Sequence, residues 1–174
     1  MKDTVLLIVD VQNAIMEEHP YQEEILIENL QKLIAYSRNK GIEIIYVRHI
    51  DEQGTELEEG SEGFQIFHKI TPLDTDKIFN KRFNSAFRKT GLKEYLDSKN
   101  IRKIILTGMQ TEYCIDATLK SAFDLDYEVI IPEDTTSTVD NPYLTGKQLH
   151  EYFQYAIWNN RFAKVIPLEE LLAK

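Results

Sequence analysis

The chain has 174 residues, 43% of them hydrophobic and 28% charged, which indicates one folded domain over residues 1–174 and excludes a largely disordered chain. There are 20 Lys and Arg residues against 29 Asp and Glu residues, and the resulting net charge of −9 argues against a nucleic-acid partner. The single cysteine excludes an intramolecular disulfide, and no apolar run is long enough for a signal peptide or membrane span, so we expect a cytoplasmic protein without a membrane partner.

The first half of the chain predicts a strand–helix–strand unit followed by a long loop. Residues 5–9 form a continuous apolar run, typical of a strand buried on both faces. Apolar residues at helical spacing predict a helix over 22–40, which Gly41 ends. A second strand is expected at 42–47. Residues 51–63 are polar and contain glycine, so we expect a loop there, and long loops in compact domains are often functional.

The second half continues the alternation of strands and helices. We expect strands at 77–80, 101–107, 128–131 and 163–166, helices at 89–100, 113–126 and 143–159, and a short tail at 168–174. Strands that alternate with helices favour right-handed crossovers and a mostly parallel sheet. The sequence therefore predicts one three-layer αβα domain.

Three reactive side chains are expected at one edge of this sheet. Asp10 ends the first strand, Lys81 follows the strand at 77–80, and Cys114 lies just past the strand at 101–107. Active sites of open α/β sheets form at the carboxyl ends of the strands, so we expect the three side chains to meet.

These residue types suit nucleophilic catalysis. A nearby ammonium and the start of a helix favour the thiolate form of a cysteine. A carboxylate accepts the thiol proton and later hands it to a leaving group, and backbone N–H groups in the turn stabilise an oxyanion. Taken singly, each residue has a structural interpretation, because Asp10 could cap a turn, Lys81 could be a solvated lysine and Cys114 could be a packing residue.

Four segments together resemble the isochorismatase-like cysteine hydrolases. They are L-L-I-V-D-V-Q-N at 6–13, K-R-F-N-S-A-F at 81–87, G-M-Q-T-E-Y-C at 108–114 and Y-E-V-I-I-P-E-D at 127–134. The resemblance implies a Rossmann-like sheet of about six strands, with Asp10, Lys81 and Cys114 as catalytic residues. It also implies a cis peptide bond between Met109 and Gln110, and an oxyanion hole formed by the backbone N–H groups of Gln110 and Cys114.

The same resemblance favours a metal-free enzyme without a cofactor. Nicotinamidases of this superfamily bind a metal through a D-x-H pattern after the second strand, whereas residues 47–52 here read V-R-H-I-D-E. Cys114 argues against a true isochorismatase, since the best-known members do not use the cysteine. We therefore expect a cysteine hydrolase that acts on a small amide, ureido, carbamoyl or lactam substrate through a thioester.

Two alternatives stay open, a nicotinamidase and a non-enzymatic interaction module on a hydrolase fold. A reactive Cys114 thiol of low pKa supports the enzyme, and an inert buried thiol supports the module. By position in the sequence, Gln12, Phe87 and Tyr113 are candidates for substrate binding. The resemblance also implies a homodimer or homotetramer. The identity of the substrate depends on the pocket-forming region 51–76, which the sequence patterns do not specify.

Overall fold

A parallel β-sheet organises the chain, as the computed structural model of residues 3–174 shows. The sheet has seven strands in the order β3-β2-β1-β4-β5-β7, and the short β6 pairs with β4. The strands are β1 (Thr4–Val9), β2 (Glu43–His49), β3 (Lys77–Lys81), β4 (Lys103–Met109), β5 (Glu128–Pro132), β6 (Thr136–Ser137) and β7 (Lys164–Ile166). Every pairing between these strands is parallel, which confirms the predicted fold class.

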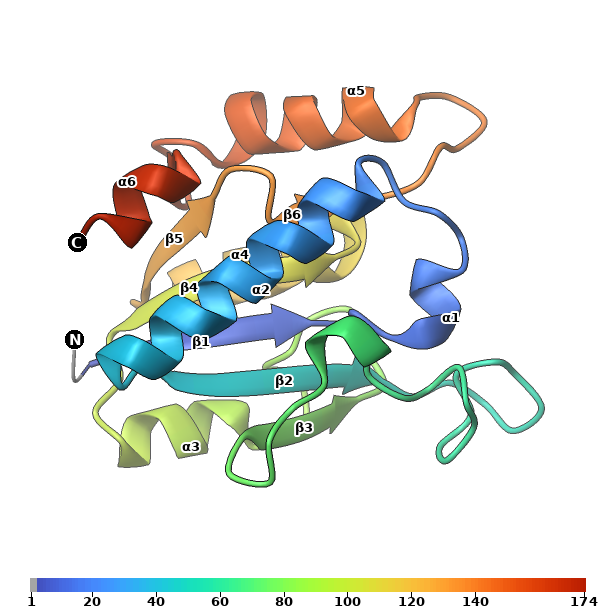
Figure 1. Cartoon of the computed structure of the whole chain (residues 1–174), viewed down its shortest axis with the longest axis horizontal. Helices are drawn as coiled ribbons and strands as arrows, with labels where there is room; N and C mark the ends of the chain where they lie inside the picture. The colour runs from blue at the N-terminus through green and yellow to red at the C-terminus, as the bar shows by residue number, and fades with distance from the viewer. Residues whose placement is uncertain (1–2) are drawn as a thin grey trace.

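Helices cover both faces of the sheet (Figure 1). They are α1 (Asn13–Met16), α2 (Glu23–Lys40), α3 (Leu92–Ser98), α4 (Asp116–Asp124), α5 (Gly146–Glu151) and α6 (Leu168–Leu172), with a 3₁₀ turn η1 (His68–Ile70) and π-helical segments η2 (Thr111–Ile115) and η3 (Tyr152–Trp158). One core packs α2 and α6 on the sheet, and the other packs α3, α4 and η3. Within residues 3–174, no helix has the length and apolar character needed to cross a bilayer.

The central strand shows why its sequence is an unbroken apolar run. All six residues of β1 are buried. Successive side chains of a strand point to opposite faces; Val5, Leu7 and Val9 therefore enter one core, and Leu6 and Ile8 enter the other. Because both faces are covered, every position of β1 after the buried Thr4 carries an apolar side chain.

Several elements differ from the sequence-based prediction, including α1 and η1, which were not predicted, and the π-helical η3, which ends the helix expected at 143–159. The helix expected at 113–126 begins earlier, as the π-helical η2 that leads into α4. The tail at 168–174 forms α6, whose Leu168 and Leu171 are buried against the sheet. Strand β6 has only two residues, both polar, and it is defined by its pairing with β4. So short a polar segment does not predict a strand from its own sequence.

The predicted loop after β2 is present, since the chain forms no helix or regular strand between His49 and His68 in the described structure. Its far end returns to the segment after β1. The Phe67 N–H donates to the Val11 carbonyl at 2.9 Å, and Gln12 forms an antiparallel bridge with Ile66. At Gly63 the loop packs so closely on α1 that a Cβ atom there would lie 2.8 Å from the Ala14 Cβ. The loop therefore lies beside the chain that leaves Asp10.

Candidate active site

Lys81 joins the two other predicted reactive side chains at the carboxyl edge of the sheet. Its Nζ lies 2.6 Å from Asp10 Oδ2 and donates to Cys114 Sγ at 3.1 Å. Asp10 follows β1, Lys81 ends β3 and Cys114 lies in η2 after β4, so three separate crossovers bring them together. The Asp10 and Lys81 side chains are 1% and 0% exposed, which places an ion pair out of water.

The backbone around Asp10 is shaped to bring these groups close. Asp10 has a left-handed φ of 54°, a conformation that aspartate tolerates better than most residues, and its N–H donates to the Val47 carbonyl at 2.9 Å. On the neighbouring strand, Gly108 has a φ of 118°, and a Cβ atom there would lie 2.0 Å from the Val9 carbonyl oxygen. Glycine at 108 therefore lets the turn that carries Cys114 approach the end of β1.

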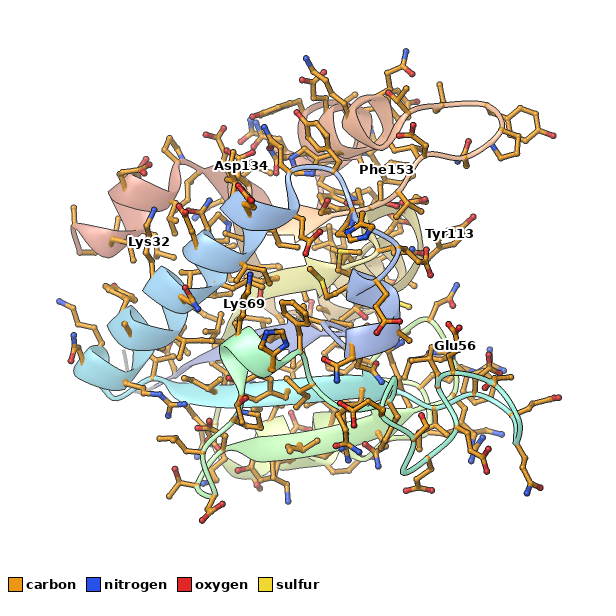
Figure 2. The ribbon with its side chains drawn as sticks, turned by 45° about the vertical axis from the view of Figure 1, so that its right-hand side comes forward. Lys32, Glu56, Lys69, Tyr113, Asp134 and Phe153 are labelled. Carbon is orange, nitrogen blue, oxygen red and sulfur yellow. The ribbon has the colours of Figure 1, made fainter. Side chains whose placement is uncertain are left out.

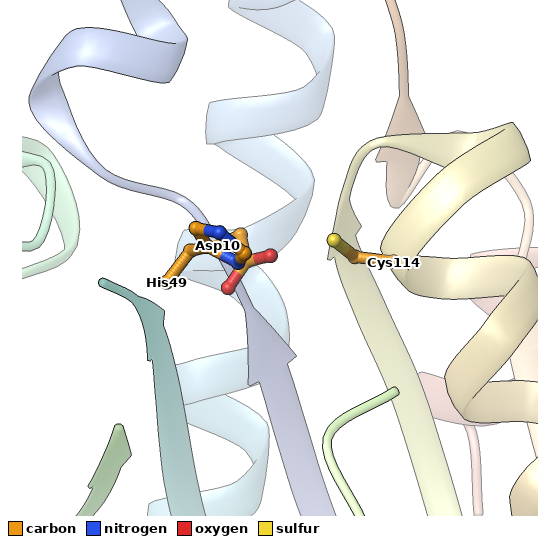
Figure 3. A group of neighbouring side chains, drawn as sticks. All are labelled: Asp10, His49 and Cys114. Atoms are coloured by element: carbon orange, nitrogen blue, oxygen red, sulfur yellow. The ribbon is translucent and has the colours of Figure 1, made fainter. Parts of the chain in front are cut away.

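His49 is a third partner of the ammonium. Its Nδ1 lies 3.1 Å from Lys81 Nζ, and its ring lies beside Asp10 at the ends of β2 and β1 (Figure 3). Burial lowers the pKa of His49, and the ammonium of Lys81 lowers it further. The ring is therefore neutral at pH 7, so that Nδ1 accepts a hydrogen bond from Lys81. Lys81 Nζ thus lies within 3.1 Å of three acceptor atoms, on Asp10, His49 and Cys114.

The Cys114 thiol is protonated in this environment. Burial raises the pKa of Cys114 to about 12 and the Asp10 carboxylate adds to this effect, while Lys81 lowers it by less. This is opposite to the low pKa that would support the enzyme, so the pKa of the free thiol taken alone favours the interaction module. The physical reason for the raised pKa is that the negative charge of Asp10 offsets the positive charge of Lys81, which leaves the desolvation of the sulfur uncompensated. A thiolate can then form only if a neighbouring base removes the proton.

The same side chains contain metal-ligand types. Asp10, His49 and Cys114 offer ligand atoms within 4.8 Å of one another, and carboxylate, imidazole and thiolate are all zinc ligands. The Lys81 ammonium, however, lies among the three, at 2.6 Å from Asp10 Oδ2 and at 3.1 Å from both His49 Nδ1 and Cys114 Sγ. A divalent cation at the centre of this group would have to displace it. The donor set therefore fits an ammonium.

A small hollow opens over these groups. It has a volume of about 220 Å³. The catalytic candidates Asp10 and Cys114 line it together with His49, and its other walls are formed by Ile15, Glu18, Leu57, Asn84, Gln110 and Tyr113. Cys114 is half-buried and contributes to the wall, so the sulfur is open to a small molecule.

The turn before Cys114 has an unusual backbone. The Met109–Gln110 peptide bond is cis, at the position where the sequence resemblance implies one. The Gln110 carbonyl accepts from the N–H groups of Tyr113 and Ile115 at 3.2 and 3.1 Å, which closes the turn around Cys114. The turn thus presents the sulfur at the mouth of the hollow.

Comparison with known proteins identifies the family. The family model of the isochorismatase domain matches residues 4–170. This chain belongs to the isochorismatase family. The family protein YrdC of Bacillus subtilis is 27% identical to it over 96% of this chain and 93% of its own. Ureidoacrylate amidohydrolase RutB of Cronobacter turicensis is 25% identical over 90% and 84%. The crystal structure of an isochorismatase family protein is 33% identical, with a TM-score of 0.90 over 95% and 99%. These relatives place the chain among hydrolases.

In this isochorismatase-family protein, hydrogen bonds join the S-A-F segment at 85–87 to the helix that follows Cys114. Ser85 Oγ donates to Ser121 Oγ at 2.8 Å, and the Ala86 N–H donates to Thr118 Oγ1 at 3.0 Å. Both partners lie on α4, which follows Cys114 directly. Phe87 stacks on Tyr127 with ring centroids 5.7 Å apart and packs against the core, outside the lining of the hollow. We therefore assign Phe87 to core packing rather than to the substrate contact that its position suggested.

Gln12 also lies outside the hollow, and its side chain holds His49 in place. Its Oε1 accepts from the His49 N–H at 2.7 Å, and its Nε2 donates to the carbonyls of His49 and Phe64 at 3.0 and 2.9 Å. The fully buried amide is thus used by the backbone, which is inconsistent with direct substrate binding. Among the predicted substrate-binding residues, Tyr113 alone lines the hollow, and it is 51% exposed.

The sequence patterns missed five of the residues that line the hollow, namely Ile15, Glu18, His49, Leu57 and Asn84. His49 appeared to be a polar residue at a strand end, and no spacing linked it to Lys81. Glu18 lies two residues after α1, a helix too short to show a period, and nothing nearby indicated that it lines the hollow. The D-V-Q sequence at 10–12 did contain a signal for His49, since the Gln12 amide holds its backbone.

Proposed function

We propose that this protein is a cysteine hydrolase that cleaves the C–N bond of a small amide-type substrate through a thioester on Cys114. The observation that carries the proposal is the position of Lys81 Nζ, 2.6 Å from the Asp10 carboxylate and 3.1 Å from Cys114 Sγ, behind the hollow that Asp10 and Cys114 line. Asp10 then acts as the proton acceptor and Lys81 as the charge partner of both. RutB, which is named as an amidohydrolase, supports the choice of an amide-type substrate.

The raised pKa of Cys114 determines how the reaction begins. Since the free thiol holds its proton at neutral pH, the proton moves to Asp10 as the sulfur attacks the carbonyl carbon. The ammonium of Lys81 stays beside both groups while negative charge passes from the carboxylate to the sulfur. The net charge of the buried group is thus constant during this step, which avoids the cost of creating an isolated charge away from water.

The later steps return each group to its starting state. The tetrahedral oxyanion accepts hydrogen bonds from the Gln110 and Cys114 backbone N–H groups. As the C–N bond breaks, Asp10 returns its proton to the departing nitrogen, and the amine leaves with a thioester on Cys114. Water then adds to the thioester with Asp10 as base, and the acid is released as the thiol regains its proton. One amide bond and one water molecule are consumed, and one acid and one amine are formed.

A panel of small amides, ureas, carbamoyl compounds, lactams and nicotinamide, assayed for release of ammonia or amine, tests the proposal. We expect turnover of at least one class, and we expect Cys114→Ala and Asp10→Asn each to lower kcat by about a thousandfold or more. Acid quench during turnover followed by mass spectrometry should find the acyl group on the Cys114 peptide. Lys77→Met is the matched control for changes on β3, since Lys77 is exposed at the opposite end of that strand from Lys81.

Two results would contradict this function. Turnover that survives in Cys114→Ala would remove the cysteine from the mechanism. Nicotinamide hydrolysis that is lost with a chelator and restored by a divalent metal would favour the nicotinamidase alternative. The metal would then replace the Lys81 ammonium between Asp10, His49 and Cys114.

A further inference from the structure

The charges around the hollow are unequal in sign. Apart from the buried Asp10–Lys81 pair and the neutral His49, Glu18 is the only charged side chain of residues 3–174 that lines it. A second hollow of about 190 Å³ shares Ile15, Glu18 and Leu57 with the first and adds the acidic side chains Asp51 and Glu56. The two hollows therefore adjoin along Glu18, and none of the basic residues between 3 and 174 lines the second one.

These three acids are not neutralised by the protein. None of Glu18, Asp51 and Glu56 forms an ion pair with any residue of 3–174, although Glu18 Oε2 accepts from Gln110 Nε2 at 3.4 Å. Arg82 is the cation beside this rim, and its guanidinium donates at 3.5 Å to the backbone carbonyl of Asp51 rather than to a carboxylate. Glu56 and Tyr113 mark the two sides of this end of the sheet in Figure 2. The rim thus carries an uncompensated negative charge.

A second, independent feature of the first hollow also calls for a donor. Asp10 is 1% exposed, and neither of its carboxylate oxygens has a hydrogen-bond partner among residues 3–174, although Oδ2 lies 2.6 Å from Lys81 Nζ and Oδ1 has no such neighbour in an ion pair. A buried carboxylate oxygen without a partner is costly, and an N–H group of a bound molecule would satisfy it. Because Asp10 lines the hollow, that N–H must enter from the same space that Cys114 faces.

We propose that this site selects amides that carry an ammonium or guanidinium group, with Glu18 as the residue that sets the preference and Asp51 and Glu56 as its continuation. The substrate class rests on the proposed hydrolase function, whereas the preference for cations over anions does not. The scissile carbonyl lies at Cys114, the amide N–H points to Asp10 Oδ1, and the cationic group extends past Glu18 into the second hollow. An anionic substrate of the same size would meet three carboxylates.

Charged thiol reagents test the preference without a known substrate, because Cys114 is the single cysteine of the chain. The probes are 2-aminoethyl methanethiosulfonate, which is cationic at neutral pH, and 2-sulfonatoethyl methanethiosulfonate, which is anionic. In both reactions the sulfur of Cys114 displaces methanesulfinate and forms a mixed disulfide, so each rate is read by mass spectrometry. Each rate is divided by the rate of the same reagent with 2-mercaptoethanol, which removes the intrinsic difference between the reagents.

We expect the corrected cation-to-anion rate ratio of the unmodified protein to be about ten or more at low ionic strength, and to fall as salt screens the rim. Glu18→Gln should lower that ratio by about threefold to tenfold, since it removes one charge beside the sulfur and keeps an acceptor for Gln110. Glu17→Gln is the matched control, because Glu17 is exposed and lines neither hollow, and it should change the ratio by about twofold at most.

Each outcome has a definite meaning. A ratio near one, or equal effects of Glu18→Gln and Glu17→Gln, would overturn the cation preference. If the cationic reagent labels Cys114 faster as expected, but no amide in the substrate panel is hydrolysed, the hydrolase is refuted and a cation-selective pocket remains. The two proposals therefore fail separately.

Discussion

The two ends of the sheet hold hollows that differ in how their charges are satisfied. The hollow at the amino end has a volume of about 400 Å³ and is the larger of the two. Apart from Asp3, its charged side chains form exposed ion pairs, with Lys164 Nζ 3.1 Å and Lys103 Nζ 3.4 Å from Glu128, and with Lys174 Nζ 3.1 Å from Glu170. Groups that already satisfy one another in water have little left to offer a substrate.

The carboxyl end is smaller and is built differently. Its ion pair is buried, the thiol beside it is held protonated, and Asp10 Oδ1 lacks a partner among residues 3–174. Such an arrangement lowers stability locally, since buried charges are stable only with good partners. In this molecule the buried groups with incomplete hydrogen bonding lie at the smaller hollow, so the volume of a hollow does not indicate where the candidate site is.

The largest effect should come from removing the buried ammonium. Lys81→Met leaves the Asp10 carboxylate buried without its cation, so we expect the free energy of unfolding to fall by about 3–5 kcal/mol and turnover to be lost. Urea denaturation and the amide assay measure the two effects. Adding Asp10→Asn to Lys81→Met should recover part of the lost stability without restoring turnover.

Lys77→Met provides the comparison on the same strand, where the lysine is exposed. It should change the free energy of unfolding by about 0.5 kcal/mol at most, as surface substitutions do. Similar losses in the two variants would show that the ion pair at the site is no more sensitive than a surface charge.

A change of pH should have an intermediate effect on stability, and the pH range of this effect should differ between groups at the two ends of the sheet. Burial lowers the pKa of His49 and of His150 in the folded state, although Asp134 and Glu151 act in the opposite direction on His150. The unfolded chain therefore binds more protons as pH falls below about 6.5, so stability is complete above that pH and is lost as pH falls toward the folded pKa values.

Urea denaturation at several pH values checks this prediction. His49→Gln and His150→Gln should each flatten the decline below about pH 6.5, and His19→Gln, whose imidazole is 83% exposed, should not. At the amino end, the hydrogen bond from Lys164 lowers the pKa of Glu128 below its usual value of 4.5, so this contribution is lost only in stronger acid. An unchanged decline in both buried-histidine variants would contradict the assignment.

The smallest effect should come from the paired surface charges. Lys164→Ala removes one partner of the exposed Glu128 carboxylate, and exposed pairs contribute about 0.2–1 kcal/mol, less in high salt. We expect unchanged turnover and a small loss in the free energy of unfolding that shrinks as salt is added. A loss of turnover in this variant would require the amino-end hollow to take part in function.

Much of the fold could be predicted because it depends on local patterns. The run at 5–9 and the helical spacing before Gly41 correspond to β1 and α2, and Asp10, Lys81 and Cys114 were expected to meet because parallel strands end at one edge. Strand β6 and helix α6 were missed, since they are short and depend on neighbours that lie far away in the sequence.

The alternation of strands and helices, and the edge of the sheet at which Asp10, Lys81 and Cys114 lie, were determined by the sequence alone, because periodicity and chain direction are local properties. Tertiary structure decided which groups are desolvated and which are partnered. It made His49 the third acceptor of Lys81, used Gln12 to hold His49, raised the pKa of Cys114 and placed Glu18 at the hollow. Those properties depend on residues that are far apart in the sequence and on the exclusion of water from the site, so no short stretch of sequence determines them.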